Sequence, residues 1–184
     1  KNIQNGSIIL DVGCGDGRTL QPLSEISKQV FGIDNDPEAI KTSRKNTQNL
    51  KNVEILLEDA EKMHFEDNFF DVVIMSGTFC NLGNTKERVL IETKRILKDK
   101  GILIMSIYNE DALKERLKLY TTYRKPDFNI ISTDKEGTVI FENGVISEQF
   151  SKEKITQILG KAGFKILKII KGKIFYLIKA EIIK

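Results

Sequence analysis

Residues 8–18 read Ile8-Ile9-Leu10-Asp11-Val12-Gly13-Cys14-Gly15-Asp16-Gly17-Arg18, and this stretch decides the fold of the 184-residue chain. Its first five residues, mostly apolar and branched, predict a strand, and a helical pattern over residues 18–27 follows the glycines. Glycines at a strand-to-helix turn let the backbone approach a ligand, and the start of the helix offers free N–H groups. The stretch therefore predicts a ligand-binding turn at the end of the first strand.

The spacing of the glycines bears on the kind of ligand. Dinucleotide-binding turns carry glycines at relative positions one, three and six, which would place the last one at position 18. This chain has Arg18 there, and its third glycine is Gly17. Asp11 lies inside the strand, where it can accept hydrogen bonds from a cationic amino group or from the N–H groups of the turn. A nicotinamide oxidoreductase is therefore disfavoured, although a glycine turn alone is a weak signal.

Acidic residues also follow the next two strands. Asp34 ends a strand over residues 30–34, where a carboxylate can accept both hydroxyls of a ribose. Asp59 follows a strand over residues 53–57, where an acid can accept a hydrogen bond from the exocyclic amine of adenine. Either residue alone could simply cap a helix or begin a loop. Three acids near the carboxyl ends of successive strands point to a nucleoside, because ligands of open α/β sheets bind at those ends.

Apolar runs and helical patterns alternate along the chain, which is typical of βαβ units on a parallel sheet. We expect strands over residues 8–12, 30–34, 53–57, 70–75, 102–107, 165–170 and 174–178, and helices over 18–27, 37–47, 85–97 and 151–162. The link at Gly172 is too short for a parallel crossover, so the last two strands should be antiparallel. Residues 108–150 form an insertion, with a helix over 110–120 and a hairpin of 138–141 with 145–150 around Asn143-Gly144.

Composition excludes several classes of protein. With 30% charged and 40% hydrophobic residues, the chain is neither disordered nor fibrous, and we expect one domain over residues 1–184. Its 2 cysteines argue against a disulfide framework and favour a cytoplasmic location. We expect no membrane partner and no signal peptide, since no stretch approaches the ~18 apolar residues of a membrane span. The net charge of +3 permits an anionic partner without demanding one.

Taken together, several blocks of the sequence resemble the class I S-adenosylmethionine-dependent methyltransferases over about residues 8–178. The blocks are ILDVGCGDGR, GIDND, LLEDAEKMHF, FDVVIMSG and RILKDKGILIMSIYN, with the closing SKEKITQILGKAGFKILKI. The resemblance implies an α/β fold with a doubly wound, mixed seven-stranded sheet of order 3-2-1-4-5-7-6. Strand 7 would be antiparallel, and helices would cover both faces.

The resemblance also implies the cofactor, S-adenosyl-L-methionine, with S-adenosyl-L-homocysteine as the product, and no metal. The residues that would hold the methionine end of the cofactor are Asp11, Gly13, Cys14, Gly15 and Arg18. Asp34 would bind the ribose with Asn35 beside the adenine, and Asp59 and Ala60 would frame the adenine edge. Met75 and Ser76 would meet the amino end of the cofactor.

Methyl transfer from a sulfonium is an in-line displacement with a good leaving group, so orientation can supply on the order of 7–11 kcal/mol. A base is optional for amines or thiolates and helpful for hydroxyls. His64, the 1 histidine, and Tyr108 are weak candidates for such a base. His64 stands where relatives commonly carry a leucine-proline-phenylalanine loop beside the adenine, which favours a structural or solvent-facing role.

The candidate substrate contacts are Phe79, Cys80, Asn81, Tyr108 and Tyr123. The first three follow the fourth strand and should face the transferred methyl group. Many small-molecule relatives carry two histidines at the positions of Cys80 and Asn81. Which residue serves as the base in this chain, if one is used, therefore stays open. Phe79 replaces the proline that precedes the nucleophilic cysteine of cytosine-C5 enzymes, so covalent catalysis by Cys80 is disfavoured. The tyrosines lie in the insertion, which usually covers the substrate in this family. Their alternative role is packing between the insertion and the sheet.

We therefore expect methyl transfer to a small-molecule acceptor held under the insertion. An RNA methyltransferase is the alternative enzyme, but the lysines over residues 161–173 fit a lysine-bearing sheet edge as well as a nucleic-acid face. The segment SGTF departs from the proline-aromatic signature of amino-methylating DNA enzymes. A non-catalytic protein that binds S-adenosylmethionine is the alternative from another class.

Overall fold

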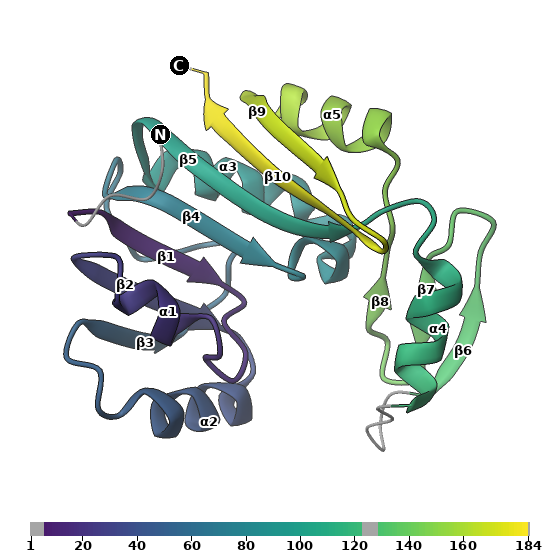
Figure 1. Ribbon diagram of the computed structural model, residues 1–184, viewed down its shortest axis with the longest axis horizontal. Coiled ribbons are helices and arrows are strands. Elements are labelled where there is room, and N and C mark those ends of the chain that lie inside the picture. Colours follow the sequence, from purple (N-terminus) through teal and green to yellow (C-terminus); the bar gives the residue numbers. More distant parts are fainter. Residues whose placement is uncertain (1–5, 123–128, 184) are drawn as a thin grey trace.

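The centre of the molecule is a seven-stranded sheet (Figure 1), seen in a computed structural model that describes residues 6–122 and 129–183. In chain order the strands are β1 (Ile8–Val12), β2 (Gln29–Asp34), β3 (Val53–Leu57), β4 (Phe70–Ser76), β5 (Leu97–Tyr108), β9 (Phe164–Lys171) and β10 (Phe175–Ile182). Their spatial order is β3-β2-β1-β4-β5-β10-β9, and β10 runs antiparallel to both of its neighbours. This confirms the expected order and the antiparallel seventh strand.

The sheet reverses its direction of winding between β1 and β4. From β1 the chain proceeds outward through β2 to β3, then returns to pair β4 with the other side of β1. At such a switch point the loops that follow the two strands diverge, which opens a crevice at their carboxyl ends. The glycine turn after β1 therefore lies at the place where an open α/β sheet binds its ligand.

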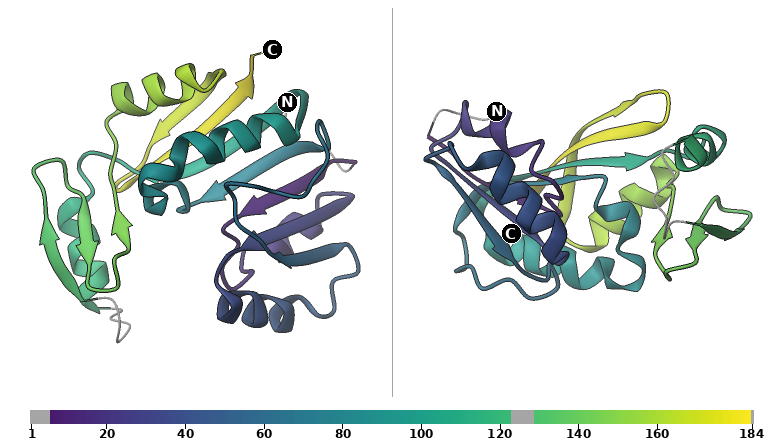
Figure 2. Two further views of the ribbon diagram at one scale, coloured as in Figure 1. Left: turned by 180° about the vertical axis from the view of Figure 1, so that it is seen from behind. Right: turned by 90° about the horizontal axis from the view of Figure 1, so that it is seen from below.

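Helices cover both faces of the sheet (Figure 2), as expected. On one face lie α1 (Leu20–Ser24) and α2 (Pro37–Thr47), and on the other lie α3 (Lys86–Ile96) and α5 (Lys152–Lys161). The caps follow the sequence: the Asp36 carboxylate accepts from the N–H of Glu38, and the Ser151 hydroxyl accepts from Lys154. Each face has its own buried apolar cluster, so both sides of the sheet contribute to the core.

Several boundaries differ from expectation. The helix expected over 110–120 spans Leu113–Thr122, and β10 extends to Ile182 rather than to residue 178. Helix α1 is shorter than the expected 18–27, because residues 18 and 19 still belong to the turn after the glycines and the N–H of Ile26 bonds three residues back, to the carbonyl of Leu23. Strand β5 begins at Leu97, earlier than the expected residue 102, because Leu97 is fully buried and pairs with Phe70. Between β4 and α3 the chain makes two short 3-10 turns, η1 (Phe79–Asn81) and η2 (Gly83–Thr85).

The insertion forms a small lobe of its own, at the lower right of Figure 1. It contains α4 (Leu113–Thr122) and a three-stranded sheet of β6 (Ile130–Thr133), β7 (Val139–Phe141) and β8 (Ile146–Ser147). The hairpin around Asn143-Gly144 is confirmed, whereas β6 was not expected. Strand β8 stops short of the expected residue 150, because the N–H groups of Glu148 and Phe150 bond to Cys80 and Tyr108 in the main lobe.

Candidate functional site

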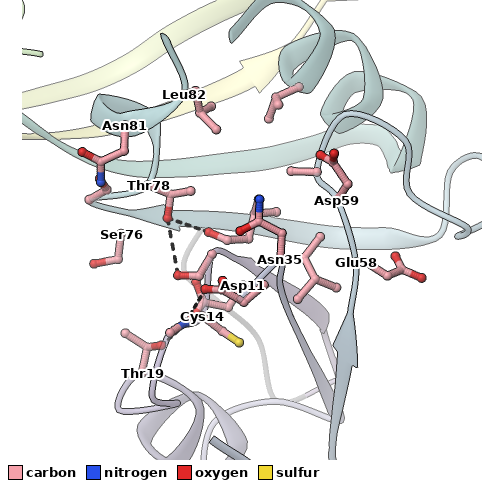
Figure 3. Close-up of a pocket in the computed structure, with 18 of the residues that line it drawn as sticks. Asp11, Cys14, Thr19, Asn35, Glu58, Asp59, Ser76, Thr78, Asn81 and Leu82 are labelled. Carbon is pink, nitrogen blue, oxygen red and sulfur yellow. Dashed lines mark hydrogen bonds between the residues drawn. The ribbon is translucent and has the colours of Figure 1, made fainter. Parts of the chain in front are cut away.

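A cavity of about 700 Å³ opens at the carboxyl ends of the parallel strands (Figure 3). It is bounded by the glycine turn, by the ends of β2 and β3, by the segment after β4, and by the end of β5. It brings together most of the residues singled out from the sequence, namely Asp11, Gly13, Cys14, Gly15, Arg18, Asp34, Asn35, Asp59, Ala60, Ser76, Asn81 and Tyr108.

The glycine turn is held tightly against the sheet. The N–H groups of Gly13 and Cys14 both donate to the carbonyl of Ile33, at 2.8 and 2.9 Å. Gly13 and Gly15 have φ values of 73° and 55°, which side chains disfavour. A Cβ on Gly13 would clash with the hydroxyl of Thr78, whereas one on Gly15 would meet nothing within 4 Å. Gly15 thus leaves its backbone open to a ligand.

Asp34 is fixed by the same turn. Its carboxylate accepts hydrogen bonds from the N–H of Gly15 at 2.9 Å and from the N–H of Asp36 at 3.0 Å. An ionised carboxylate has about four lone-pair sites, so acceptor capacity remains for a ligand. The arrangement suits a diol that donates two hydrogen bonds to one carboxylate.

Asp11 is the most buried acid of the cavity, with 1% of its surface exposed. The hydroxyl of Thr19 donates to its Oδ2, while Oδ1 has no hydrogen-bond partner among the described residues. Burial raises the pKa of Asp11 to about 6; the Thr19 bond opposes this rise, and the charge of Asp34 adds to it. Leaving a buried acceptor unpaired costs about 1–3 kcal/mol, so this oxygen suits a donor or cation supplied by a ligand.

Three predicted contacts do not reach the cavity. Met75, Phe79 and Cys80 are each fully buried and are absent from its lining, so the expectation that Phe79 and Cys80 face the transferred methyl group is wrong. Met75 points into the core because side chains alternate along β4. The η1 turn directs Phe79 and Cys80 inward, where the Cys80 sulfur accepts from the N–H of Tyr108 at 3.2 Å.

Neither thiol is set up as a nucleophile. Burial raises the pKa of Cys14 to about 12 and that of Cys80 to about 11, and each shift is due mainly to desolvation of the thiolate. Both thiols therefore stay protonated near neutral pH, where only the thiolate attacks or binds metals. Cys14 acts as a small filler of the glycine turn.

The two candidate bases differ in position. Tyr108 lines the cavity, but burial, followed by the neighbouring Tyr120, raises the pKa of its phenol, so it can donate a hydrogen bond rather than accept a proton. His64 does not line the cavity; it contacts Glu58 and packs at a tilt against Phe65, with 4.3 Å between ring centroids. A structural or solvent-facing role stays the prediction for it. Tyr123 lies outside the described residues.

Several residues that line the cavity were not predicted from the sequence. Thr19 and Thr78 line it near the glycine turn, and Leu82, Thr85 and Val89 line its far end. The Thr78 hydroxyl donates to the carbonyl of Val12 at 2.7 Å and so ties the segment after β4 to the turn after β1. A small polar residue directly after a buried strand is the signal that could have drawn attention to Thr78.

A seven-stranded sheet of this order, with a nucleoside-sized cavity at its switch point, defines the class I S-adenosylmethionine-dependent methyltransferases. The chain belongs to the methyltransferase domain family, whose sequence model matches residues 3–163. Its cofactor is S-adenosylmethionine, and the orphaned oxygen of Asp11 and the open backbone at Gly15 both fit a cationic nucleoside.

Several known proteins are similar to this chain. The demethylmenaquinone methyltransferase of Staphylococcus saprophyticus is 27% identical over 175 residues, which cover 91% of this chain and 74% of that protein. The Staphylococcus epidermidis enzyme of the same name is 32% identical over 67% of this chain, and the chain spans 52% of its length. Among solved structures, the PH0226 protein of Pyrococcus horikoshii is 26% identical with a TM-score of 0.75, covering 96% and 82% of the two chains. A Burkholderia thailandensis 1,6-didemethyltoxoflavin-N1-methyltransferase with bound S-adenosylhomocysteine shares the fold, with 14% identity, a TM-score of 0.74, and 98% and 72% of the chains covered.

Proposed function

We propose that this chain transfers the methyl group of S-adenosylmethionine to a small-molecule acceptor. The observation that carries the proposal is a single cavity that runs from Asp11, Asp34 and Asp59 to a second group of lining residues around Asn81 and Tyr108. The first group suits the cofactor, and the second leaves room for an acceptor beside it. When bound, the cofactor supplies an electrophilic methyl group on a positively charged sulfur.

The cofactor end would be held by the residues that the cavity brings together. Asp34 would accept the ribose hydroxyls, with Asn35 and Asp59 beside the adenine and Ala60 against its edge. The backbone at Gly15 and the carboxylate of Asp11 would meet the methionine end. Arg18 contributes less directly, because its guanidinium already bonds to Asp16 at 2.9 and 3.0 Å.

The residues at the acceptor end of the cavity can orient an acceptor molecule, but they do not supply a strong base. Ser76 lies between the two ends and would meet the amino end of the cofactor. The residues that line the acceptor end are Gly77, Thr78, Asn81, Leu82, Thr85, Val89 and Tyr108, which supply hydroxyls, one amide and apolar surface. Burial keeps the Tyr108 phenol protonated by raising its pKa, so it could donate a hydrogen bond to the acceptor. This chemistry supports an acceptor whose nucleophilic atom needs no strong base, aligned with the methyl group by contact.

We also propose that residues 108–150 belong to one domain with the sheet and cover the acceptor. Support comes from contacts that fasten this lobe to the segment after β4: Lys86 pairs with Glu148, and the N–H of Glu148 donates to the Cys80 carbonyl at 2.9 Å. The lobe lies on the side of the sheet toward which the parallel strands point (Figures 1 and 2).

A small molecule is favoured over RNA by the charges around the cavity. Its lining contains six carboxylates and one basic residue, Arg18. This excess of negative charge would repel a chain of phosphates. The lysines near the carboxyl end are partly neutralised, since Lys171 pairs with Glu110 and Lys173 with Glu115. No helix of the described residues is long and apolar enough to span a membrane. Two free cysteines among these residues support the proposed cytoplasmic location.

The test is a calorimetric titration with S-adenosylmethionine, S-adenosylhomocysteine and NAD, followed by a turnover assay that measures S-adenosylhomocysteine formed with a panel of metabolites. We expect both sulfur nucleosides to bind and NAD not to bind. Asp34→Ala should weaken binding by about 10- to 100-fold, because charge-assisted hydrogen bonds contribute about 1.5–3 kcal/mol each. Retained binding without turnover on any acceptor, RNA included, would favour the non-catalytic alternative.

A further inference from the structure

The described residues at the acceptor end of the cavity include no group that could take a proton from a substrate. All six carboxylates of the lining come from β1, the glycine turn and the segments at the ends of β2 and β3. The hydroxyls of Thr78 and Thr85 donate to the carbonyls of Val12 and Leu82, at 2.7 and 2.8 Å. Neither hydroxyl bonds to a carboxylate or an imidazole of the described residues, so neither is activated as a base.

A buried cation lies next to this end of the cavity. Arg116 in α4 is fully buried, and its guanidinium carbon is 4.4 Å from the ring centroid of Tyr108, which lines the cavity. The groups that accept its hydrogen bonds are two backbone carbonyls, one amide and one phenol, all of them uncharged. An arginine stays protonated in proteins, and Arg116 forms no ion pair within residues 6–122 and 129–183. Its positive charge is therefore not balanced by a nearby carboxylate.

The other charges near this end leave the positive charge in place. Lys86 pairs with Glu148, and both side chains are largely buried, so this pair is neutral as a whole. Glu110 and Asp111 share Lys171 and are partly exposed, so water and salt screen their charges. The buried charge beside the acceptor end is thus a net positive one, whereas the cofactor end is lined by acids.

The absence of a base and the buried cation point to the same class of acceptor. We infer that the acceptor is an organic oxyanion, a carboxylate or a phenolate, which enters the cavity already deprotonated and is stabilised by the charge of Arg116. Such an oxygen bonds to the methyl carbon with one of its own lone pairs while the carbon–sulfur bond breaks, and the electron pair of that bond stays on sulfur. No proton has to leave, so the transfer needs no base. The inference rests on the proposed methyl transfer and names the class of its substrate.

The size of the effect follows from the burial of the charge. Two charges attract each other more strongly next to the protein interior than in water, and salt screens a buried charge less than an exposed one. At a separation of several ångströms this attraction changes a binding equilibrium about tenfold. We therefore expect an acid to bind about tenfold more tightly than its own primary amide, which has a similar shape and no charge.

The experiment measures the dissociation constants of acid and amide pairs calorimetrically, with S-adenosylhomocysteine present so that no methyl group is transferred. The pairs are acetate with acetamide, benzoate with benzamide, and naphthoate with naphthamide. Arg116→Gln should abolish the preference for the acid. Gln149→Leu is the matched control, because it removes hydrogen bonds to Arg116 and to the carbonyl of Glu110 but keeps the charge, and it should weaken acid and amide alike. Lys118→Met removes an exposed charge from α4 and should change neither.

A turnover assay with S-adenosylmethionine distinguishes the two kinds of oxyanion. Mass spectrometry detects methyl esters formed from the carboxylates and methyl ethers formed from phenol and para-nitrophenol, which ionise in different pH ranges. Where phenols react, the pH at which the rate is half-maximal should follow the pKa of each phenol, because no group of the protein takes the proton.

Equal binding of acid and amide by the unmodified chain, or binding of neither, would overturn the inference, as would one pH midpoint shared by the two phenols. If Arg116→Gln does not fold, the ratio of acid to amide binding by the unmodified chain decides alone. The proposed methyl transfer fails in a different way, because the sulfur nucleosides would then not bind, or no acceptor of any class, amines and thiols included, would be methylated.

Discussion

Replacing Arg116 with methionine should loosen the insertion while leaving the seven-stranded sheet intact. Arg116 lies in α4 and is fully buried. Its guanidinium donates to the carbonyls of Gly137 at 2.9 Å and Ser147 at 2.6 Å, and to the side chain of Gln149 at 3.2 Å. None of these partners is a carboxylate. The side chain joins α4 to Gly137, which precedes β7, and to Ser147 in β8.

The same guanidinium fixes a wall of the cavity. It lies over the ring of Tyr108, 4.4 Å from the ring centroid, and Phe175 stacks on that ring at 4.7 Å. The Tyr108 ring therefore contacts both α4 of the insertion and β10 of the seven-stranded sheet. A buried cation–π contact contributes about 2 kcal/mol. Each of the two carbonyls left without its donor costs about 1–3 kcal/mol, so the expected loss for the insertion is roughly 4–8 kcal/mol.

Hydrogen exchange resolved along the chain measures this effect. In Arg116→Met, amides of α4 and of β6, β7 and β8 should lose protection, whereas amides of β1 and β4 should keep it. Cofactor binding should persist, because Asp11 and Asp34 do not contact Arg116. Lys118→Met makes the same chemical change on the exposed face of α4 and should alter nothing. Equal protection in the two variants would refute the argument that Arg116 organises the lobe.

Three further predictions concern the cavity and the segment that follows β4. Folding raises the pKa of Asp11 from 3.8 to about 6, so the folded chain binds the carboxyl proton more tightly than the unfolded chain does. The free energy of unfolding should therefore fall by on the order of 3 kcal/mol as the pH rises from about 4 to 7 and Asp11 ionises. Urea unfolding of the ligand-free chain should therefore show Asp11→Asn gaining stability over the wild type at pH 7 and not at pH 4; a constant difference would contradict this. Gly15→Ala should destabilise the chain by about 1 kcal/mol, because of its positive φ, yet weaken cofactor binding strongly, since the new methyl group enters the cavity. Gly13→Ala should cost more stability, because its Cβ would clash with Thr78, and thermal unfolding alongside calorimetry separates the two effects. Cys80, with its pKa raised to about 11 by burial, should resist iodoacetamide in the folded chain and react only after unfolding, as mass spectrometry would show.

Much of the fold and part of the site could be predicted from local patterns. The expected bounds of the strand at residues 8–12 and of the helix at 37–47 agree with β1 and α2, because alternation, the Asp36-Pro37 cap and the glycine turn act over a few neighbouring residues. The Asn143-Gly144 hairpin follows from the same kind of local preference. The acids Asp11, Asp34 and Asp59 could be placed together because parallel strands end at one edge of a sheet.

The direction of individual side chains could not be predicted in this way. Phe79 and Cys80 follow β4 in the chain, yet the η1 turn rotates them into the core and leaves Asn81 and Leu82 at the cavity. The short extent of β8 depends likewise on hydrogen bonds to residues about 40 or more positions away in the main lobe, which no window of sequence contains.

By itself the sequence determined the order of most strands and helices, the place of the glycine turn and the positions of the acids that line the cavity. These depend on backbone preferences and on periodicities that act within a few residues. Only the tertiary structure decided that Arg116 is buried without a carboxylate partner, that one oxygen of Asp11 has no partner in the described residues, and that Tyr108 contacts both lobes. Each of these depends on atoms from distant segments meeting at one place, where burial changes the energy of a charge far more than its sequence neighbours do.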